Sequence, residues 1–161
     1  MVVSFTGLMG GGKTSWIVEQ FHKKPDSIIY YTNVPTSFTY LGDKKDEYVF
    51  KDSFFWSKWV KYISDLCFDV LDKDTFKKRY KAVEDQDLYI HNCKIFLDES
   101  HMILTSLSPK QIKGFVLFIT MSRHVSVDLY LFAQTLSLLN RDIYQLIEMH
   151  YYAIPASARL F

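Results

Sequence analysis

The stretch VVSFTGLMGGGKTSWIVEQFH, at residues 2–22, decides the fold of this chain. Residues 2–6 are mostly apolar and rich in β-branched side chains, which predicts a buried strand. Residues 7–14, GLMGGGKT, match the pattern G-x-x-x-x-G-K-T without a mismatch. Apolar side chains then recur at helical spacing, so we expect a helix over residues 13–22. A strand, a glycine-rich turn and a helix in this order predict a phosphate-binding P-loop.

Each part of this loop suits a nucleoside triphosphate. Consecutive backbone N–H groups form a concave anion site, and the helix N-terminus adds the positive end of its dipole. Lys13 is expected to contact the β- and γ-phosphates, and the Thr14 hydroxyl to bind Mg²⁺. A glycine-rich turn without a ligand is the alternative, and the complete pattern argues against it. The predicted nucleotide-binding residues are Gly7, Gly10, Gly11, Gly12, Lys13, Thr14 and Ser15.

A second signal lies at residues 94–101, KIFLDESH, where an apolar strand ends in two adjacent carboxylates. This arrangement is typical of a Walker B segment. Asp98 is expected to hold Mg²⁺ through its hydration shell beside Thr14, and Glu99 to polarise the attacking water. A solvated turn is the alternative for an Asp-Glu pair at a strand end, and the preceding P-loop favours the catalytic interpretation.

The position of Glu99 indicates hydrolysis and favours ATPases with an extra strand between the P-loop strand and the Walker B strand. Residues 127–133 are the candidate for that strand, and Gln134 follows them. Its amide would sense or orient the γ-phosphate; a solvated glutamine is the alternative. Arg123 and Arg141 flank the strand, and either could stabilise charge on the γ-phosphate of a neighbouring subunit. A surface arginine or an ordinary ion pair is the alternative for each.

The other elements predict a three-layer α/β fold, with helices on both faces of a mainly parallel sheet, in a single domain over residues 1–161. Residues 34–51 are turn-rich and predict a surface loop with room for a hairpin within it. Trp56 and Trp59 lie on one stripe and are expected in the core. Further strands are expected at residues 28–32, 95–97 and 150–155, and further helices at 54–71, 75–87, 109–122 and 141–147.

Composition narrows the class of protein. The chain has 161 residues, of which 48% are hydrophobic and 23% charged, and its net charge is +1. These values argue against disorder and against a whole-molecule basic field for nucleic acids. Cys67 and Cys93 match no metal spacing and predict free thiols in a reducing compartment. His101 and His124 also lack metal-ligand spacing, so we expect hydrogen-bonding or packing roles.

No run reaches the roughly 18 apolar residues of a membrane span, and no signal-peptide pattern opens the chain. We therefore expect the cytosolic side of a membrane, unless a further C-terminal segment carries an anchor.

The chain resembles the Zot (zonula occludens toxin) domain. The resemblance covers nearly the whole chain, and the Arg-His pair before a strand ending in Gln-Thr is more specific than the P-loop alone. The Zot domain is shared with assembly ATPases of filamentous phages and lies within the FtsK–HerA group. The motifs that carry the resemblance are the P-loop, LDESH at residues 97–101, SRH at 122–124, VDLYLFAQT at 127–135 and NRDI at 140–143.

The resemblance implies a RecA-like core, a viral source and an ATP-driven role in virion assembly and extrusion, or in moving the viral genome. It implies Mg²⁺ and ATP, and we expect a ring of identical subunits. Further expected partners are viral DNA, other virion assembly proteins, and a membrane reached through other subunits or a missing C-terminal segment. The expected location is the host cytoplasm, the inner face of the host membrane or the virion. Family members usually continue into a transmembrane helix, whereas this sequence ends at residues 158–161, ARLF, so membrane attachment is not carried over.

Other functions stay open. A DNA-packaging ATPase of the same superfamily predicts basic residues on the inner face of a ring. A nucleotide-binding switch or small-molecule kinase predicts an acceptor pocket and lid arginines, and the scarcity of arginine and the presence of Glu99 weigh against it. A secreted toxin that opens tight junctions is suggested only by the family's name.

Overall fold

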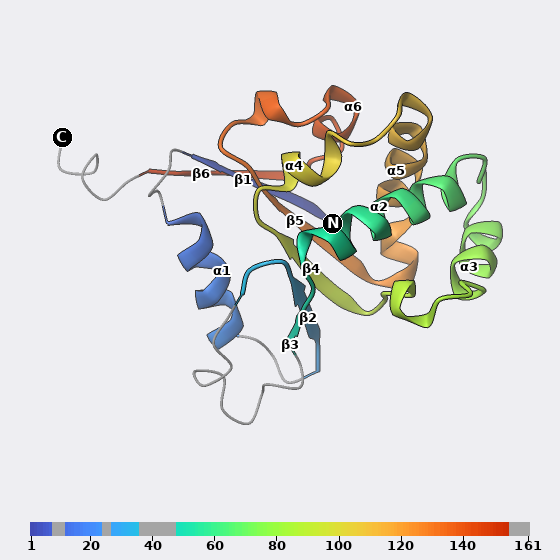
Figure 1. Cartoon of the computed structure of the whole chain (residues 1–161), viewed down its shortest axis with the longest axis horizontal. Helices are drawn as coiled ribbons and strands as arrows, with labels where there is room; N and C mark the ends of the chain where they lie inside the picture. Colours follow the sequence, from blue (N-terminus) through green and yellow to red (C-terminus); the bar gives the residue numbers. More distant parts are fainter. Residues whose placement is uncertain (8–11, 24–26, 36–47, 155–161) are drawn as a thin grey trace.

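The computed structural model describes residues 1–7, 12–23, 27–35 and 48–154. In these ranges six strands form one sheet in which all neighbouring strands run parallel (Figure 1). β5 lies between β1 and β4, so the predicted extra strand between the P-loop strand and the Asp98 strand is confirmed. In spatial order the strands are β3 (Tyr48–Phe50), β2 (Ile29–Thr32), β4 (Cys93–Leu97), β5 (Val127–Phe132), β1 (Val2–Gly7) and β6 (Met149–Ala153).

Helices cover both faces of this sheet, and the predicted three-layer α/β fold is confirmed (Figure 1). α1 lies on one face, over a cluster of mostly aromatic side chains. The other helices lie on the opposite face and enclose a larger core. The α-helices are α1 (Lys13–His22), α2 (Ser53–Cys67), α3 (Lys73–Lys81), α4 (Ser100–Leu104), α5 (Pro109–Met121) and α6 (Arg141–Tyr144); the 3₁₀ turns are η3 (Gln86–Leu88), η4 (Ser122–Val125) and η5 (Leu136–Leu138).

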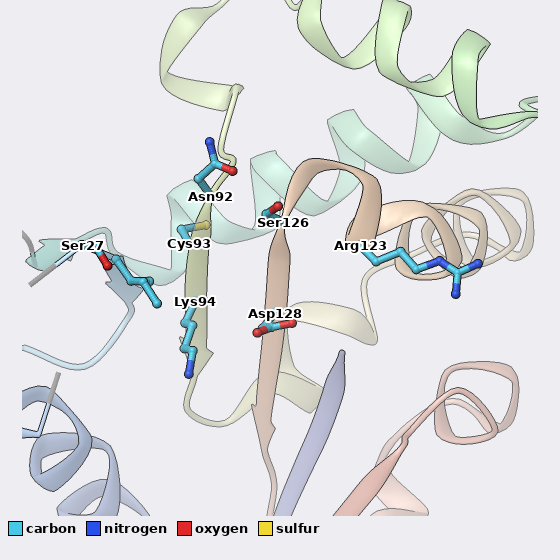
Figure 2. Close-up of a pocket in the computed structure, with 8 residues that line it drawn as sticks. Ser27, Asn92, Cys93, Lys94, Arg123, Ser126 and Asp128 are labelled. Carbon is cyan, nitrogen blue, oxygen red and sulfur yellow. The ribbon is translucent and has the colours of Figure 1, made fainter. Parts of the chain in front are cut away.

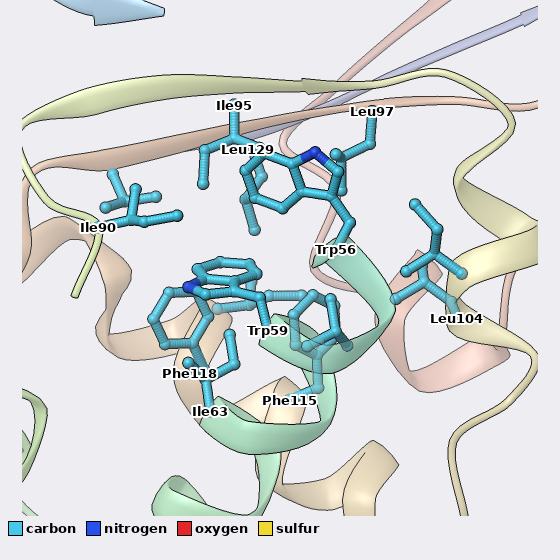
Figure 3. Packing of buried hydrophobic residues seen from close by; sticks show 14 of the residues in the cluster. Trp56, Trp59, Ile63, Ile90, Ile95, Leu97, Leu104, Phe115, Phe118 and Leu129 are labelled. Carbon is cyan, nitrogen blue, oxygen red and sulfur yellow. The ribbon is translucent and has the colours of Figure 1, made fainter. Parts of the chain in front are cut away.

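The larger core is built around two tryptophans of α2. Trp56 and Trp59 are fully buried, as predicted, and their rings meet edge to face at 5.4 Å (Figure 3). Trp59 also meets Phe118 of α5 edge to face, which joins the two helices above the sheet. On the backbone side, Gly114 of α5 is so close to α2 that an added Cβ would lie 1.9 Å from the Ser64 carbonyl oxygen.

Side-chain caps set where several helices begin. The Asp52 carboxylate accepts the backbone N–H of Phe55 at the start of α2, and Asp72 does the same for two N–H groups of α3. Ser108 and Gln111 form a reciprocal capping box at the start of α5. Asp85 caps η3, so the helix predicted over residues 75–87 is divided into α3 and η3.

Two further elements, β3 and α4, also differ from the sequence-based prediction. Residues 48–50 fall in the predicted surface loop, yet they form β3, which pairs in parallel with β2; the rest of the predicted loop, residues 36–47, lies outside the described residues. Three residues are too few for an alternating pattern, and β3 is stabilised by long-range contacts, including the Tyr48 hydroxyl donating to the Phe21 carbonyl. α4 was not predicted, because its five residues are shorter than any helical repeat in the sequence. The C-terminal boundary of the predicted domain, residue 161, also lies outside the described residues.

Cys67 and Cys93 are both buried and free, in agreement with the prediction of unpaired thiols. Across the described parts of the chain, no helix combines the length and the hydropathy that crossing a bilayer requires.

Candidate nucleotide-binding site

The carboxyl ends of β1, β4 and β5 meet at one edge of the sheet, because these strands are parallel neighbours. Gly7 ends β1 with a φ of 148°, a region that favours glycine, and its N–H donates to the Gln134 carbonyl at 3.1 Å. A Cβ at Gly7 would also lie 2.4 Å from the Ala153 carbonyl oxygen of β6. The first glycine of the predicted P-loop is therefore required by both backbone angle and packing.

The far end of the predicted loop opens α1. Gly12 caps this helix in a left-handed conformation with a φ of 83°. Lys13 is 8% exposed, and its ammonium donates to the Gly7 carbonyl at 2.7 Å. The positive charge is thus held between the two described ends of the loop. Gly10 and Gly11 lie outside the described residues, and Ser15 is exposed in the first turn of α1.

Thr14 and Asp98 are 84 positions apart in sequence and are joined in the structure. The Thr14 hydroxyl donates to Asp98 Oδ2 at 2.7 Å. A hydroxyl and a carboxylate are hard oxygen donors of the kind that Mg²⁺ takes together with waters and phosphate oxygens. Within the described residues no group of three or more His, Cys, Asp or Glu side chains could hold a metal ion. The donor chemistry therefore fits the predicted Mg²⁺.

Asn33 fixes the backbone of Asp98, and sequence reasoning missed this residue. The Asp98 N–H donates to Asn33 Oδ1 at 2.7 Å, and Asn33 Nδ2 donates to the Asp98 carbonyl at 2.8 Å. Asn33 directly follows β2, the neighbour of β4. The sequence does show a polar amide directly after the strand predicted at residues 28–32. That signal points to Asp98 only once β2 and β4 are known to be neighbouring strands.

Glu99 turns the chain from β4 into α4. Its backbone is left-handed, with a φ of 48°, and its N–H donates to Asp98 Oδ1 at 3.0 Å. Ser100 is buried, and its hydroxyl donates to the Phe132 carbonyl at the end of β5. The Glu99 carboxylate is half exposed and lies 3.5 Å from Nδ1 of His101. Among the described residues that Nδ1 has no hydrogen-bond partner, so His101 packs beside the carboxylate.

Gln134 follows β5 at the same edge of the sheet. Its backbone carbonyl accepts a hydrogen bond from the Gly7 N–H, and the residue is exposed. The predicted sensor thus adjoins the start of the predicted loop. Lys13, Thr14, Asp98 and Glu99 lie at the same edge, so the structure gathers these five predicted residues.

The two predicted arginines lie elsewhere. Arg141 is exposed on α6 and lines a cavity of about 280 Å³ with Tyr144 and residues of the η5 segment. Arg123 lies in η4, just before β5, and lines a cavity of about 620 Å³ at the amino ends of the strands. Figure 2 shows Lys94 and Asp128 near the starts of the neighbouring strands β4 and β5, with Arg123 on the other side of Asp128 from Lys94. Arg123 therefore faces away from the Asp98 edge of its own subunit, and a contact with another subunit's site stays a prediction for both arginines.

A family comparison agrees with this geometry. The family model described as Zonular occludens toxin (Zot) matches residues 1–156. The chain belongs to the Zot family. No curated protein sequence matches the chain significantly.

Solved structures are similar to this Zot-family chain, and one of them has a TM-score above 0.5. The cytoplasmic domain of the type VII secretion ATPase EccC from Thermomonospora curvata has a TM-score of 0.56 at 10% identity, over 93% of this chain and 20% of that one. The N-terminal domain of zonular occludens toxin from Neisseria meningitidis has a TM-score of 0.49 at 16% identity, over 94% and 75% of the two chains. The genome packaging NTPase B204 of Sulfolobus turreted icosahedral virus 2, in complex with ATP-gammaS, has a TM-score of 0.49 at 16% identity, over 97% and 76%.

Proposed function

We propose that this Zot-family chain is a viral ATPase motor that hydrolyses ATP with Mg²⁺ and drives virion assembly and extrusion or genome movement. The observation that carries the proposal is the 2.7 Å hydrogen bond between Thr14 and Asp98. It joins the two segments that the sequence predicts as P-loop and Walker B, and Lys13 lies beside them at the end of β1.

Each residue of the site has a separate role in the proposed ATP hydrolysis. Backbone N–H groups of the loop and the Lys13 ammonium bind the phosphates. Thr14 and Asp98 would hold Mg²⁺, which would supply further positive charge against the phosphates. The Glu99 carboxylate orients the attacking water and accepts its proton. The Gln134 amide contacts the γ-phosphate from the end of β5. The hydrogen bonds of Asn33 keep Asp98 in position for this arrangement.

An arginine from another subunit completes the site. In the described chain no arginine lies at the edge that gathers Asp98 and Glu99, whereas Arg141 and Arg123 are exposed on other parts of the surface. An arginine finger supplied in trans stabilises charge in the transition state of related phosphoryl transfers. The proposal therefore includes a ring of identical subunits, with Arg141 ranked ahead of Arg123.

The motor's cargo is viral DNA or a coat protein, and its other partners are virion assembly proteins. The proposed location is the host cytoplasm, the inner face of the host membrane or the virion, with the membrane reached through partner subunits or a further segment.

An ATPase assay with the purified chain tests the proposal. We expect phosphate release from ATP that is lost on removing Mg²⁺ with a chelator and lost in Lys13→Ala, whose loop has no ammonium against the phosphates. Asp98→Ala should instead weaken the Mg²⁺-dependent part of ATP binding. Lys77→Ala, a change of an exposed lysine of α3 outside the site, is the matched control. A parent protein that binds no nucleotide would contradict the proposal, and stimulation of the rate by DNA would select DNA as the cargo.

A further inference from the structure

A second feature adjoins the predicted loop on the α1 face of the sheet. It is a cavity of about 390 Å³, within the size range of small-molecule sites. The start of α1 contributes Gly12, Lys13 and Ser15 to its lining, and Trp16 lies one position further along the helix. The sheet contributes Phe5 of β1 and Tyr151 of β6. The cavity is therefore continuous with the proposed phosphate site.

Aromatic rings form one wall of this cavity. The Phe132 and Phe5 rings stack at 4.7 Å with 7° between their planes, and the Phe5 and Tyr151 rings stack at 4.8 Å and 14°. This run crosses β5, β1 and β6 and ends at Tyr151, which is 44% exposed. Among the described residues, Tyr151 stacks on Phe5 alone. The centroid of the Trp16 ring lies 4.2 Å from that of Phe5, with 39° between the two ring planes.

The strand order indicates how a bound nucleotide would lie across the edge of the sheet. Asp98 ends β4, and the order β4-β5-β1-β6 puts the cavity beyond the loop on the opposite side of β1. β4 and β6 are three strand spacings apart, roughly 14 Å. A triphosphate whose γ end lies near Asp98 and whose middle lies on the loop then directs its ribose and base toward β6.

We propose that the cavity is the subsite for the purine base of the nucleotide, with Tyr151 and Trp16 as its aromatic walls. The inference rests on the proposed function, since the loop must hold the phosphates. Tyr151 offers a planar surface at the end of the ring stack, and stacking of a base on an aromatic ring is favourable for any base with a π-face. A purine covers more of that ring than a pyrimidine does, so the subsite favours ATP or GTP over UTP.

Calorimetry with two probes, ATP and inorganic tripolyphosphate, tests the subsite in the full chain with Mg²⁺. Tripolyphosphate has the phosphates without the base. We expect Tyr151→Ala to weaken ATP binding by about 5- to 150-fold, the range for loss of one base stack. Tripolyphosphate affinity should stay within about twofold, and Tyr151→Phe should retain ATP affinity. Tyr144→Ala is the matched control, because this α6 tyrosine is 45% exposed and lies outside the cavity.

The outcomes separate the subsite from the phosphate site. An unchanged ATP affinity in Tyr151→Ala, or an equal loss of affinity for both probes, overturns the base subsite. In either case, ATP binding by the parent protein still supports the phosphate site. A parent that binds neither probe overturns both. Trp16 fluorescence gives a readout that needs no variant at Tyr151, since Trp56 and Trp59 are fully buried on the other face. ATP should change the emission and tripolyphosphate should not, and Trp16→Phe should remove the response; an equal response to both probes counts against the base subsite.

Discussion

Glu99 has a left-handed backbone conformation at a position where glycine would be free of strain. A non-glycine residue held there costs of order 1–3 kcal/mol and persists only where its surroundings fix it. The two hydrogen bonds between Asp98 and Asn33 fix the residue before it, and the Ser100 hydroxyl bond to Phe132 fixes the residue after it. The consequence is a carboxylate kept at the edge of the sheet where the loop begins.

Glu99→Gln tests the role of this carboxylate. The amide keeps the size and backbone of the residue but cannot accept a proton from water. We expect ATP to bind with nearly unchanged affinity, while the turnover rate falls by about 10²-fold or more. Glu84→Gln, at an exposed position between α3 and η3, is the matched control and should hydrolyse at the parent rate. Turnover of Glu99→Gln at the parent rate would assign the base to another group.

At the scale of elements, the contact between α2 and α5 depends on one glycine. An added Cβ at Gly114 would meet the carbonyl of Ser64, an atom of a fully buried residue on a packed helix. A shift of the α2 backbone would disturb the Trp59–Phe118 contact between the same two helices.

Gly114→Ala should therefore destabilise the fold, although alanine is the better helix former by roughly 0.5–1 kcal/mol. Overpacking of this kind costs about 1–3 kcal/mol, which corresponds to a fall in Tm of roughly 2–10 °C for a chain of this size. Thermal unfolding followed by circular dichroism measures it. Lys113→Ala, one position earlier and exposed, should leave Tm within about 2 °C. A Gly114→Ala variant as stable as the parent would contradict the close packing.

The buried thiols report on the same packing. Burial raises the pKa of Cys67 in α2 to about 12, and burial together with the nearby Asp128 charge raises the pKa of Cys93 in β4 to about 12. Because the thiolate is the reactive form, both cysteines should be unreactive at pH 8 in the folded chain. A disulfide reagent at pH 8 should modify neither thiol within minutes in buffer and both in denaturant. Rapid reaction of either thiol in buffer would contradict its burial.

At the scale of the whole molecule, the position of the arginines matters most. β5 begins near Arg123 and ends near the Asp98 edge, about six residues or roughly 20 Å away. Arg141 is exposed on α6, a helix that packs on α5. Each guanidinium is thus available to a neighbouring copy, and the proposed shared site would make hydrolysis depend on assembly.

Mixing experiments test the shared site. Arg141→Ala and Lys13→Ala subunits should each be inactive alone, because the finger and the phosphate site are each worth orders of magnitude in rate, about 10³–10⁵ for a finger. A mixture should regain part of the activity at interfaces that pair an intact loop with an intact arginine. The ATPase rate of the parent should also rise more than linearly with protein concentration.

A second mixture, in which Arg123→Ala subunits replace the Arg141→Ala subunits, decides between the two arginines. The arginine whose variant is inactive alone and regains activity with Lys13→Ala subunits is the finger. Absence of rescue in both mixtures, or a dilute monomer hydrolysing ATP at the full rate, would favour a self-contained nucleotide switch.

Local sequence determined the loop and most helices. The motif GLMGGGKT at residues 7–14 can be recognised from the sequence alone, because its glycines are required by backbone angle and its lysine by charge. Gly7 and Gly12 indeed have positive φ angles. Apolar periodicity likewise predicted α1 and α2, and each begins within one position of its predicted start. These signals act over a few residues, so they can be recognised without the rest of the chain.

Only the tertiary structure decided which distant residues meet. The pairing of β2 with β4 brought Asn33 to Asp98, and the position of β6 beside β1 brought Tyr151 to the cavity next to Lys13. β3 and α4 are too short for periodicity, and the η4 turn put Arg123 at the far edge from Asp98. In a parallel sheet, strand order depends on crossover connections and packing of whole helices, so no short stretch of sequence contains it.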